Sequence, residues 1–260
     1  MVMGINYRKI PVSKMVDGNV MIDSDSLAIE SVIRLIFNNQ KVATLLGSPN
    51  DSKYLLLGHL ISEGYLEYAQ LIDYNIQSID TKSSNNGLDV SVESELKLAN
   101  EPNFSGITTT SCGACNSEGL DELLKHLPIV SSKITFNDSI LHLGMESMKS
   151  LQKGFAKTGG MHSASLMSTE GTIICFAEDI GRHNAVDKVI GKSLEYGGAN
   201  RSILLLSGRC GWDIVAKASR ANIPVIACIG ASSSLAADCA RSLGIKIFAF
   251  VKESSHTIIG

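Results

Sequence analysis

Three short runs of uninterrupted apolar residues, separated by amphipathic segments, constrain the fold of this 260-residue chain more than any other feature. The runs lie at 203–206, 225–229 and 246–251, the last of which is apolar after Lys246, and the segments between them, 212–221 and 235–243, have helical periodicity. A strand that is apolar at every position is buried on both faces, which is typical of parallel strands joined by helices. We therefore predict an α/β fold with a mainly parallel sheet in the C-terminal half.

The residues upstream of these runs extend the same pattern. Apolar spacing predicts a helix over 145–153 and another over 184–194, where valine, isoleucine and leucine recur on one stripe. Between these helices, strands at 162–167 and 172–177 flank a polar turn at 168–171 that ends in glycine. The C-terminal half is therefore expected to be a layered domain with helices on both faces of its sheet.

The first hundred residues give weaker signals, which predict a smaller α+β unit. A strand is expected over 41–46, a helix over 51–63, and a hairpin with strands at 75–80 and 88–98. Residues 26–38 combine alternating and helical spacing of apolar side chains, so a strand and a helix both fit them.

A polar segment of small residues separates the two units and carries a pair of cysteines. It has little apolar periodicity, which predicts a mobile loop, and a short helix is expected after it over 118–127. We therefore divide the chain into an N-terminal α+β subdomain at 1–98, the loop at 99–118 and a C-terminal domain at 119–260.

The charge of the chain is small and unevenly distributed. The formal net charge is −3, so the overall charge gives no reason to expect nucleic acid as a partner. Residues 131–260 carry a small positive balance, which fits a small anionic ligand and fits random surface scatter equally well.

The sequence shows no targeting signal. No N-terminal stretch has the form of a signal peptide, and the apolar runs are too short to cross a bilayer. We therefore expect a cytoplasmic protein that contacts no membrane. Thiols stay reduced in the cytosol, so the six cysteines are expected to be free thiols, ligands or catalysts rather than a disulfide framework.

Three segments that follow the apolar runs, 207–209, 230–234 and 251–255, combine small residues with hydroxyl groups or a cation. In an open α/β sheet, ligands bind at the carboxyl ends of the strands, often beside helix N-termini. Each segment alone is better explained as an ordinary helix start, but three at one edge favour a cradle for nucleotide phosphates. The sequence has no Walker loop and no G-x-G-x-x-G motif, which removes the usual support for ATP-dependent or dinucleotide enzymes.

Two further segments are rich in polar function. Residues 178–188 place Arg182 and His183 at a strand-to-helix junction, where they could donate to a phosphate or a purine, while Asp179 or Asn184 could cap the helix. Residues 158–162 place a diglycine before a strand, which fits a tight turn with a surface histidine as well as it fits a ligand site.

The cysteine pair, Cys112-Gly113-Ala114-Cys115, is the strongest candidate for chemistry. A cysteine in a mobile loop can carry sulfur as a persulfide between a donor and a distant acceptor, and a second thiol can resolve the persulfide by forming a disulfide. A structural zinc site would need a second such pair, which the sequence lacks. A thioredoxin-like redox site would follow a strand, whereas a polar run precedes this pair, and a zinc ion that bridges a dimer is also conceivable.

The other four cysteines have simpler interpretations. Cys175 and Cys228 lie in apolar strands and Cys239 lies in an amphipathic helix, so all three are expected to be buried thiols. Cys210 follows a polar turn, and the sequence leaves its role open.

Taken together, these motifs resemble the FdhD family of formate dehydrogenase accessory sulfurtransferases. The resemblance rests on five stretches, which are Cys112-Gly113-x-Cys115, Phe155-x-x-Thr158-Gly159-Gly160-x-His162-x-Ala164, Asp179-Ile180-Gly181-Arg182-His183-Asn184-Ala185-x-Asp187-Lys188, Ser207-Gly208-Arg209 and the run from Ile223-Pro224-Val225 to Leu243-Gly244. Cys210-Gly211-Trp212 and residues 45–50 depart from the family pattern, which bears on individual cofactor contacts.

The resemblance implies a function and a fold beyond what the residues alone indicate. Family members take sulfur from a cysteine desulfurase and pass it to the molybdenum (or tungsten) bis-molybdopterin guanine dinucleotide cofactor of formate dehydrogenase, with GDP as a fragment ligand. They are homodimers with a three-layer fold like that of cytidine deaminases. The implied catalytic residues are Cys112 and Cys115, with no metal site. The implied cofactor-binding residues are Thr158, Gly159, Gly160, His162, Asp179, Arg182, His183, Asn184, Asp187, Lys188, Ser207, Gly208, Arg209, Phe250, Val251, Lys252, Glu253, Ser254 and Ser255.

Three alternative functions compete with the sulfur carrier. A zinc deaminase would need a His-x-Glu motif, but His162-Ser163-Ala164 has no glutamate, so deamination is disfavoured. A non-catalytic chaperone could hold the cofactor without using either cysteine. A thiol redox protein would use the cysteines but no cofactor.

Overall fold

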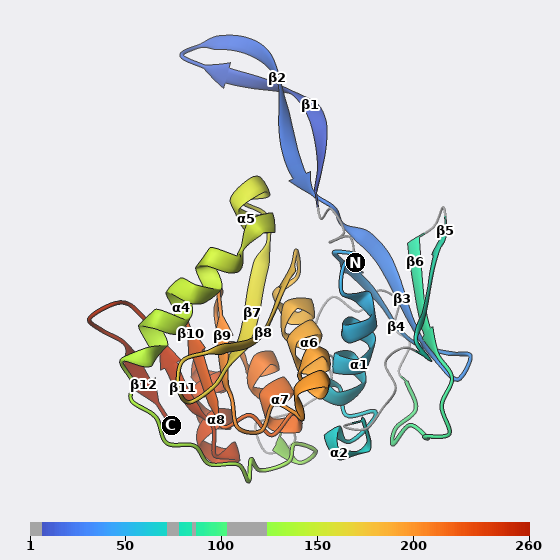
Figure 1. The fold of residues 1–260 in the computed structure, drawn as a ribbon, viewed down its shortest axis with the longest axis vertical. Helices are drawn as coiled ribbons and strands as arrows, with labels where there is room; N and C mark the ends of the chain where they lie inside the picture. The colour runs from blue at the N-terminus through green and yellow to red at the C-terminus, as the bar shows by residue number, and fades with distance from the viewer. Residues whose placement is uncertain (1–6, 72–77, 85–86, 103–123) are drawn as a thin grey trace.

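A computed structural model describes residues 7–71, 78–84, 87–102 and 124–260 (Figure 1). Its centre is a six-stranded sheet in the order β12-β11-β10-β9-β7-β8. The strands are β7 (His162–Met167), β8 (Ile173–Asp179), β9 (Ile203–Leu206), β10 (Val225–Cys228), β11 (Lys246–Ala249) and β12 (Thr257–Ile259).

This central sheet is mixed, so the prediction of a mainly parallel sheet is wrong. Strands β9, β10 and β11 are parallel to one another, as their continuous apolar sequences indicate. Strand β7 pairs antiparallel with β8 and with β9, and β12 pairs antiparallel with β11. The reason is local, because the short turn between β7 and β8 can only join antiparallel neighbours.

Helices cover both faces of the sheet, as the sequence predicts. One face packs on α4 (Ile140–Leu151), through a cluster that includes Leu141, Met145 and Met148. The opposite face packs on three helices that share the main hydrophobic core with β7, β9 and β10 (Figure 1). These helices are α6 (Arg182–Ser193), α7 (Trp212–Arg220) and α8 (Ser234–Leu243).

The N-terminal unit is a four-stranded sheet and a helix that share this same core. Its strands follow the order β4-β3-β6-β5, and α1 (Ser52–Ser62) crosses α6 of the C-terminal domain. The crossing is very close, because a Cβ atom on Gly58 would lie 1.7 Å from the carbonyl oxygen of Asp187. The strands are β3 (Ser31–Phe37), β4 (Gln40–Gly47), β5 (Asp80–Ser84) and β6 (Gly87–Val92), and a short helix, α2 (Tyr68–Leu71), follows α1.

A two-stranded ribbon, which the sequence did not predict, projects from the body of the protein (Figure 1). It consists of β1 (Tyr7–Val16) and β2 (Asn19–Ala28), joined by a turn in which Asp17 and Gly18 both have positive φ. Several large apolar side chains on it are exposed, with Ile22 at 88%. The ribbon therefore has no apolar neighbour that buries its tip within the described residues.

Most predicted elements are present with shifted ends. Residues 26–38 contain the end of β2 and all of β3 and no helix, and the predicted hairpin is β5–β6. The first strand of the hairpin was expected over 75–80, but β5 begins at Asp80. All residues of β5 are exposed, so they show no apolar pattern that would locate the strand. The helix expected over 118–127 lies largely outside the described residues. The short helix α5 (Lys153–Thr158) and β12 were missed.

No helix among the described residues is long and apolar enough to cross a bilayer. The likeness to cytidine deaminases and the division of the chain at residue 98 remain predictions.

Candidate functional site

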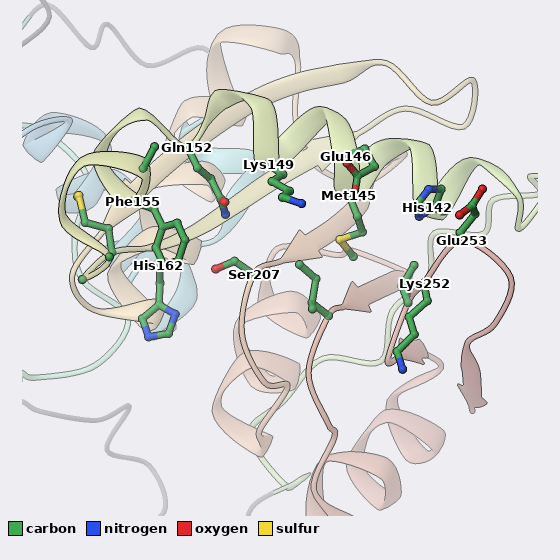
Figure 2. Close-up of a pocket in the computed structure, with 16 residues that line it drawn as sticks. His142, Met145, Glu146, Lys149, Gln152, Phe155, His162, Ser207, Lys252 and Glu253 are labelled. Atoms are coloured by element: carbon green, nitrogen blue, oxygen red, sulfur yellow. The ribbon is translucent and has the colours of Figure 1, made fainter. Parts of the chain in front are cut away.

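A cavity of about 920 Å³ lies between α4, α5 and the carboxyl ends of the parallel strands (Figure 2). This is the edge of the sheet where the sequence predicts a ligand, and the volume falls in the range of small-molecule sites. The residues that line the cavity are His142, Met145, Glu146, Lys149, Gln152, Phe155, Ala156, Gly159, Gly160, Met161, His162, Ser207, Ile229, Val251, Lys252 and Glu253.

The segments that follow β9, β10 and β11 are hydrogen-bonded side by side. The amide of Gly230 donates to the carbonyl oxygen of Gly208 at 3.1 Å, and the amide of Phe250 donates to Gly230 at 3.1 Å. A Cβ atom at Gly230 would lie 2.9 Å from that same Gly208 oxygen, so only glycine allows this close approach. The three predicted segments thus form one continuous rim.

The other wall of the cavity is α4 and the short helix α5. The chain turns between them at Gln152, whose side-chain amide donates to Ser163 at 2.5 Å. The Glu178 carboxylate accepts from the backbone amides of Gly154 and Phe155 at 2.8 Å each, which fixes the start of α5. Gly159, with φ of 65°, ends α5 and returns the chain to β7.

The two ends of the cavity differ in chemistry. Phe155 and His162 lie at one end, while His142, Lys252 and Glu253 lie at the other (Figure 2). Burial lowers the pKa of His162, and the nearby charges of Arg182, His183 and Arg209 lower it further. His162 is therefore neutral at pH 7.

Arg182, His183 and Arg209 lie outside the lining of the cavity, close enough to His162 to act on it electrostatically. The imidazole of His183 contacts the carboxylate of Asp213, and Arg182 Nη2 lies 3.6 Å from the same carboxylate. Burial raises the pKa of Asp213, but the hydrogen bond and charge of His183 outweigh it and hold the pKa below its ordinary value. Asp213 thus orients two predicted binding residues, and no motif in the sequence pointed to it.

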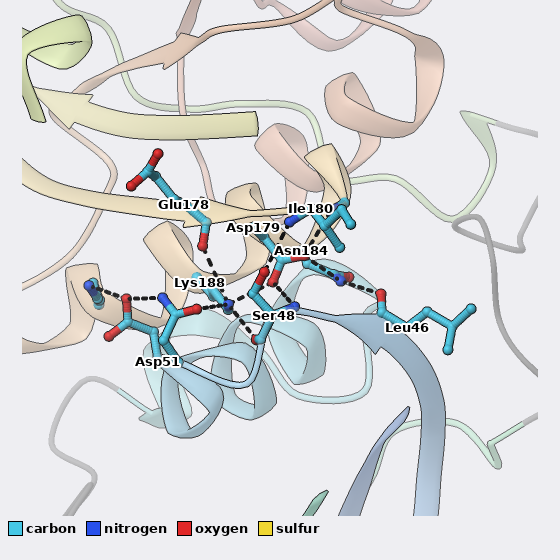
Figure 3. Close-up of polar contacts among 11 residues, drawn as sticks. Leu46, Ser48, Asp51, Glu178, Asp179, Ile180, Asn184 and Lys188 are labelled. Carbon is cyan, nitrogen blue, oxygen red and sulfur yellow. Dashed lines mark hydrogen bonds and ion pairs between the residues drawn. The ribbon is translucent and has the colours of Figure 1, made fainter. Parts of the chain in front are cut away.

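Asp179, Asn184 and Lys188 of the 178–188 segment lie in a buried network rather than in the cavity (Figure 3). Lys188 and Asp179 are both 0% exposed and form an ion pair at 2.6 Å. Lys188 also donates to the carbonyl oxygen of Ser48 at 2.9 Å, and Asn184 donates to that of Leu46 at 2.9 Å. These side chains therefore tie α6 to the loop that follows β4.

Asp187, another predicted binding residue, belongs to a second buried network. Lys217 lies 2.8 Å from Asp187 and 2.6 Å from Glu63, and it donates to Ser62 at 2.9 Å. Burial raises the pKa of Asp187, but the charge of Lys217 and the contact with His59 outweigh it and lower the pKa to about 2. This network joins α1, α6 and α7.

The four cysteines outside the Cys-x-x-Cys pair are buried free thiols, and Cys210, which the sequence left open, is among them. Burial raises the pKa of Cys175 to about 12 and those of Cys228 and Cys239 to about 11. Burial also raises the pKa of Cys210 well above its ordinary value. A thiol is nucleophilic only as the thiolate, so these four are unreactive at neutral pH. Cys112 and Cys115 lie outside the described residues.

The cavity brings together only part of the predicted site. Thr158 lies just outside the cavity and accepts from Gly160 at 3.1 Å, and the carbonyl oxygen of Ser255 accepts from the amide of Lys252 at 2.9 Å. Gly208, Phe250 and Ser254 also lie outside the lining. The predicted residues in the lining are Gly159, Gly160, His162, Ser207, Val251, Lys252 and Glu253.

Sequence reasoning missed the α4 and α5 side of the cavity. His142, Glu146 and Lys149 appear in sequence as the polar face of an amphipathic helix. Phe155 did have a signal, because it opens one of the five stretches that carry the resemblance, but it was not named as a binding residue. Within the described residues, no group of three His, Cys, Asp or Glu side chains forms a metal site.

Comparisons with known proteins give a consistent result. The model of the FdhD/NarQ family matches residues 28–259. The chain is 31% identical to the sulfur carrier protein FdhD of Streptomyces avermitilis, with 98% of this chain and 94% of the relative covered. It is 34% identical to the sulfur carrier protein FdhD of Sulfolobus acidocaldarius, with 98% and 96% covered.

A solved structure shares the fold. It belongs to a protein from Desulfotalea psychrophila assigned as a formate dehydrogenase accessory protein, and it superposes with a TM-score of 0.74 at 20% identity, with 98% of this chain and 96% of that chain covered. Together with the family match and the two relatives, this places the whole described fold within one family. The chain therefore belongs to the FdhD/NarQ family.

Proposed function

We propose that this protein is a sulfur carrier that accepts sulfur from a cysteine desulfurase on Cys112 or Cys115 and delivers it to the cofactor of a formate dehydrogenase. The observation that carries the proposal is the state of the other thiols. Four of the six cysteines are buried and protonated, which leaves Cys112 and Cys115 as the candidates for thiolate chemistry. The curated relatives are themselves named sulfur carrier proteins.

The carrier step is a thiolate exchange in the cytosol. The carrier thiolate attacks the terminal sulfur of the desulfurase persulfide, a new S–S bond forms on the carrier, and the donor cysteine leaves as a thiolate. Attack by the second cysteine on the inner sulfur would then form a disulfide and release hydrosulfide for the acceptor. A cellular thiol would reduce the disulfide and restore both cysteines.

The cavity is the proposed site for the nucleotide end of the cargo, a molybdenum or tungsten bis-molybdopterin guanine dinucleotide. Lys149 and Lys252 line the cavity with exposed ammonium groups, which are suited to a diphosphate. The glycine rim and the diglycine at 159–160 allow a ligand to approach the backbone closely.

Loading with sulfur tests the carrier step. The protein is incubated with a cysteine desulfurase and cysteine, and the added sulfur is located by peptide mass. We expect 32 mass units (about one sulfur atom) on the peptide that carries Cys112 and Cys115, removable by a reductant. The matched control replaces Cys175, Cys210, Cys228 and Cys239 by alanine or serine and should load normally if it folds. Loading on those four residues alone would contradict the proposal.

Replacing Cys112 and Cys115 one at a time distinguishes a carrier from a chaperone. A chaperone that only holds the cofactor would tolerate both Cys112→Ala and Cys115→Ala, whereas a carrier loses formate dehydrogenase activation with at least one of them. Calorimetry with GDP tests the cargo site separately. Absence of GDP binding at millimolar concentration would remove the cavity from the proposal and leave the cysteines in it.

We extend the proposal to a homodimer that forms through the β1–β2 ribbon. An isolated two-stranded ribbon is marginally stable in water, and Met15, Val20 and Ile22 are 68%, 65% and 88% exposed on one face. Lys14 and Asp23 lie on the opposite face of the ribbon, where they pair with each other at 2.8 Å, so they stay outside this contact. A two-fold axis along the ribbon would stack apolar tip on apolar tip.

A further inference from the structure

The cavity has two chemically different ends, so the two ends of an elongated ligand would bind in one preferred orientation. Phe155 is 46% exposed although it is a large aromatic side chain, and Ile229, also in the lining, is 44% exposed. Single exposed apolar side chains are common on protein surfaces, so exposure alone carries no conclusion. Here both exposed side chains face one cavity that also contains two lysines.

Phe155 is held in place by rigid contacts. Its backbone amide and that of Gly154 are bound to the buried carboxylate of Glu178. A Cβ atom at Gly154 would lie 2.4 Å from Met161 Sδ, so α5 packs directly against the start of β7. The backbone position of Phe155 is therefore set by its contacts with the sheet and not by a free loop.

His162 lies at the same end of the cavity as Phe155 (Figure 2). It opens β7, and a Cβ atom at Gly208 would lie 3.4 Å from its Nδ1 atom, so the imidazole lies beside the rim. Burial lowers the pKa of His162, and the surrounding cations lower it further, so the ring is mostly uncharged at neutral pH. An uncharged imidazole offers an aromatic face and one donor and one acceptor, which suits a planar base better than a phosphate.

The two lysines are placed further along the cavity. Lys149 comes from the middle of α4, and Lys252 follows β11 on the opposite wall (Figure 2). Both are exposed, and within the described part of the chain neither has an ion-pair partner. Their ammonium groups are therefore available to an anion.

We propose that Phe155 and His162 form the base-binding end of the cavity and that Lys149 and Lys252 hold the diphosphate, so that a nucleotide lies along the cavity from α5 towards the end of β11. The proposal rests on the cargo site proposed above and adds its orientation. It makes Phe155 the main stacking residue and predicts that the remainder of a larger cofactor leaves the cavity beside His142 and Glu253.

Calorimetry on the full chain with GDP, guanosine and inorganic pyrophosphate tests the orientation. Stacking on an aromatic side chain is worth enough that Phe155→Ala should weaken GDP about 5- to 100-fold. Guanosine should weaken equally, pyrophosphate should change less than about twofold, and Phe155→Trp should restore GDP binding because it keeps the stacking face. Lys149→Ala with Lys252→Ala should weaken GDP and pyrophosphate but not guanosine.

Two results would overturn the orientation. Phe155→Ala could lose pyrophosphate as strongly as guanosine, or it could bind GDP as the wild type does. In the second case, loss of its complex with the desulfurase would make Phe155 a protein contact. Absence of GDP binding to the wild type would be a different failure, because it would remove the cargo site itself.

Discussion

The strand-end cavity and the buried network around Lys188 contain the same types of side chain in opposite environments. Lys149 and Lys252 are exposed on the cavity walls, whereas Lys188 is 0% exposed and paired with Asp179. An exposed ammonium group can exchange water for a ligand at little cost. A buried one is costly to separate from its partner, so it holds elements together instead.

The comparison shows how one polar motif can serve two purposes. The residues from Glu178 to Lys188 include the partly exposed Arg182 and His183, but Asp179, Asn184 and Lys188 bind the N-terminal unit. The network therefore fixes α6, and α6 in turn positions the charged groups near His162. Substitutions in the buried network should lower the stability of the fold, whereas substitutions in the cavity lining should lower the affinity for the ligand.

The largest expected effect is on stability. Lys188→Met leaves the Asp179 carboxylate buried without its cation, which should lower the free energy of unfolding by about 3–5 kcal/mol. Urea denaturation measures it. The matched control is Lys149→Met on the exposed face of α4, where we expect less than about 0.5 kcal/mol. Equal losses in the two variants would remove the distinction between network and cavity.

The second buried network, around Asp187 and Lys217, should make the free energy of unfolding fall at low pH. The pKa of Asp187 is lowered to about 2 in the folded protein, so its contribution is complete above the unfolded value near 4. As pH falls from about 4 to about 2, the free energy of unfolding should drop by about 2 kcal/mol from this group. Denaturation curves across this range measure the slope. Asp187→Asn should flatten it, and an unchanged slope would contradict the assignment.

The cavity lysines should affect binding without affecting folding. Lys252→Ala should weaken GDP about 3- to 10-fold, because one charge-assisted contact to the diphosphate is lost. Calorimetry at two salt concentrations checks this, since the loss should be smaller at high salt. The control is Lys157→Ala, an exposed lysine on α5 that lies outside the lining. An equal loss with Lys157→Ala would indicate a general charge effect.

The smallest effect on folding is expected in the ribbon, which belongs to neither region. Ile22→Ser should change the free energy of unfolding of the monomer by less than about 0.5 kcal/mol, because the side chain is 88% exposed. It should shift the molar mass measured by light scattering from dimer towards monomer. Ser13→Ala, on the same ribbon face, is the control. A monomeric wild type would refute the ribbon as a dimer contact.

The core of the fold was predictable where buried strands have continuous apolar sequences. Residues 203–206 are apolar at every position and form β9 with the predicted bounds. The ribbon was missed because its strands bury almost nothing and so follow no apolar alternation. The direction of the β7 strand was missed because continuous burial does not distinguish parallel from antiparallel neighbours.

The candidate site was predictable on one wall only. Ser207 and Lys252 follow strands whose carboxyl ends must meet at one edge, so topology places them together. Lys149 and Phe155 reach the cavity from helices packed across that edge, and no local spacing shows such a tertiary contact. Lys188 was predicted to bind the cofactor, but it is buried and paired with Asp179. The sequence of a polar motif does not show which of its lysines is buried.

Hydrogen–deuterium exchange with and without GDP tests the distinction between the two regions most directly. The account predicts that GDP slows exchange in peptides covering 142–162 and 250–255, while peptides covering 46–51 and 184–193 are already protected and do not change. Protection by GDP confined to 46–51 and 184–193 would contradict it, because the ligand would then bind at the network and not in the cavity.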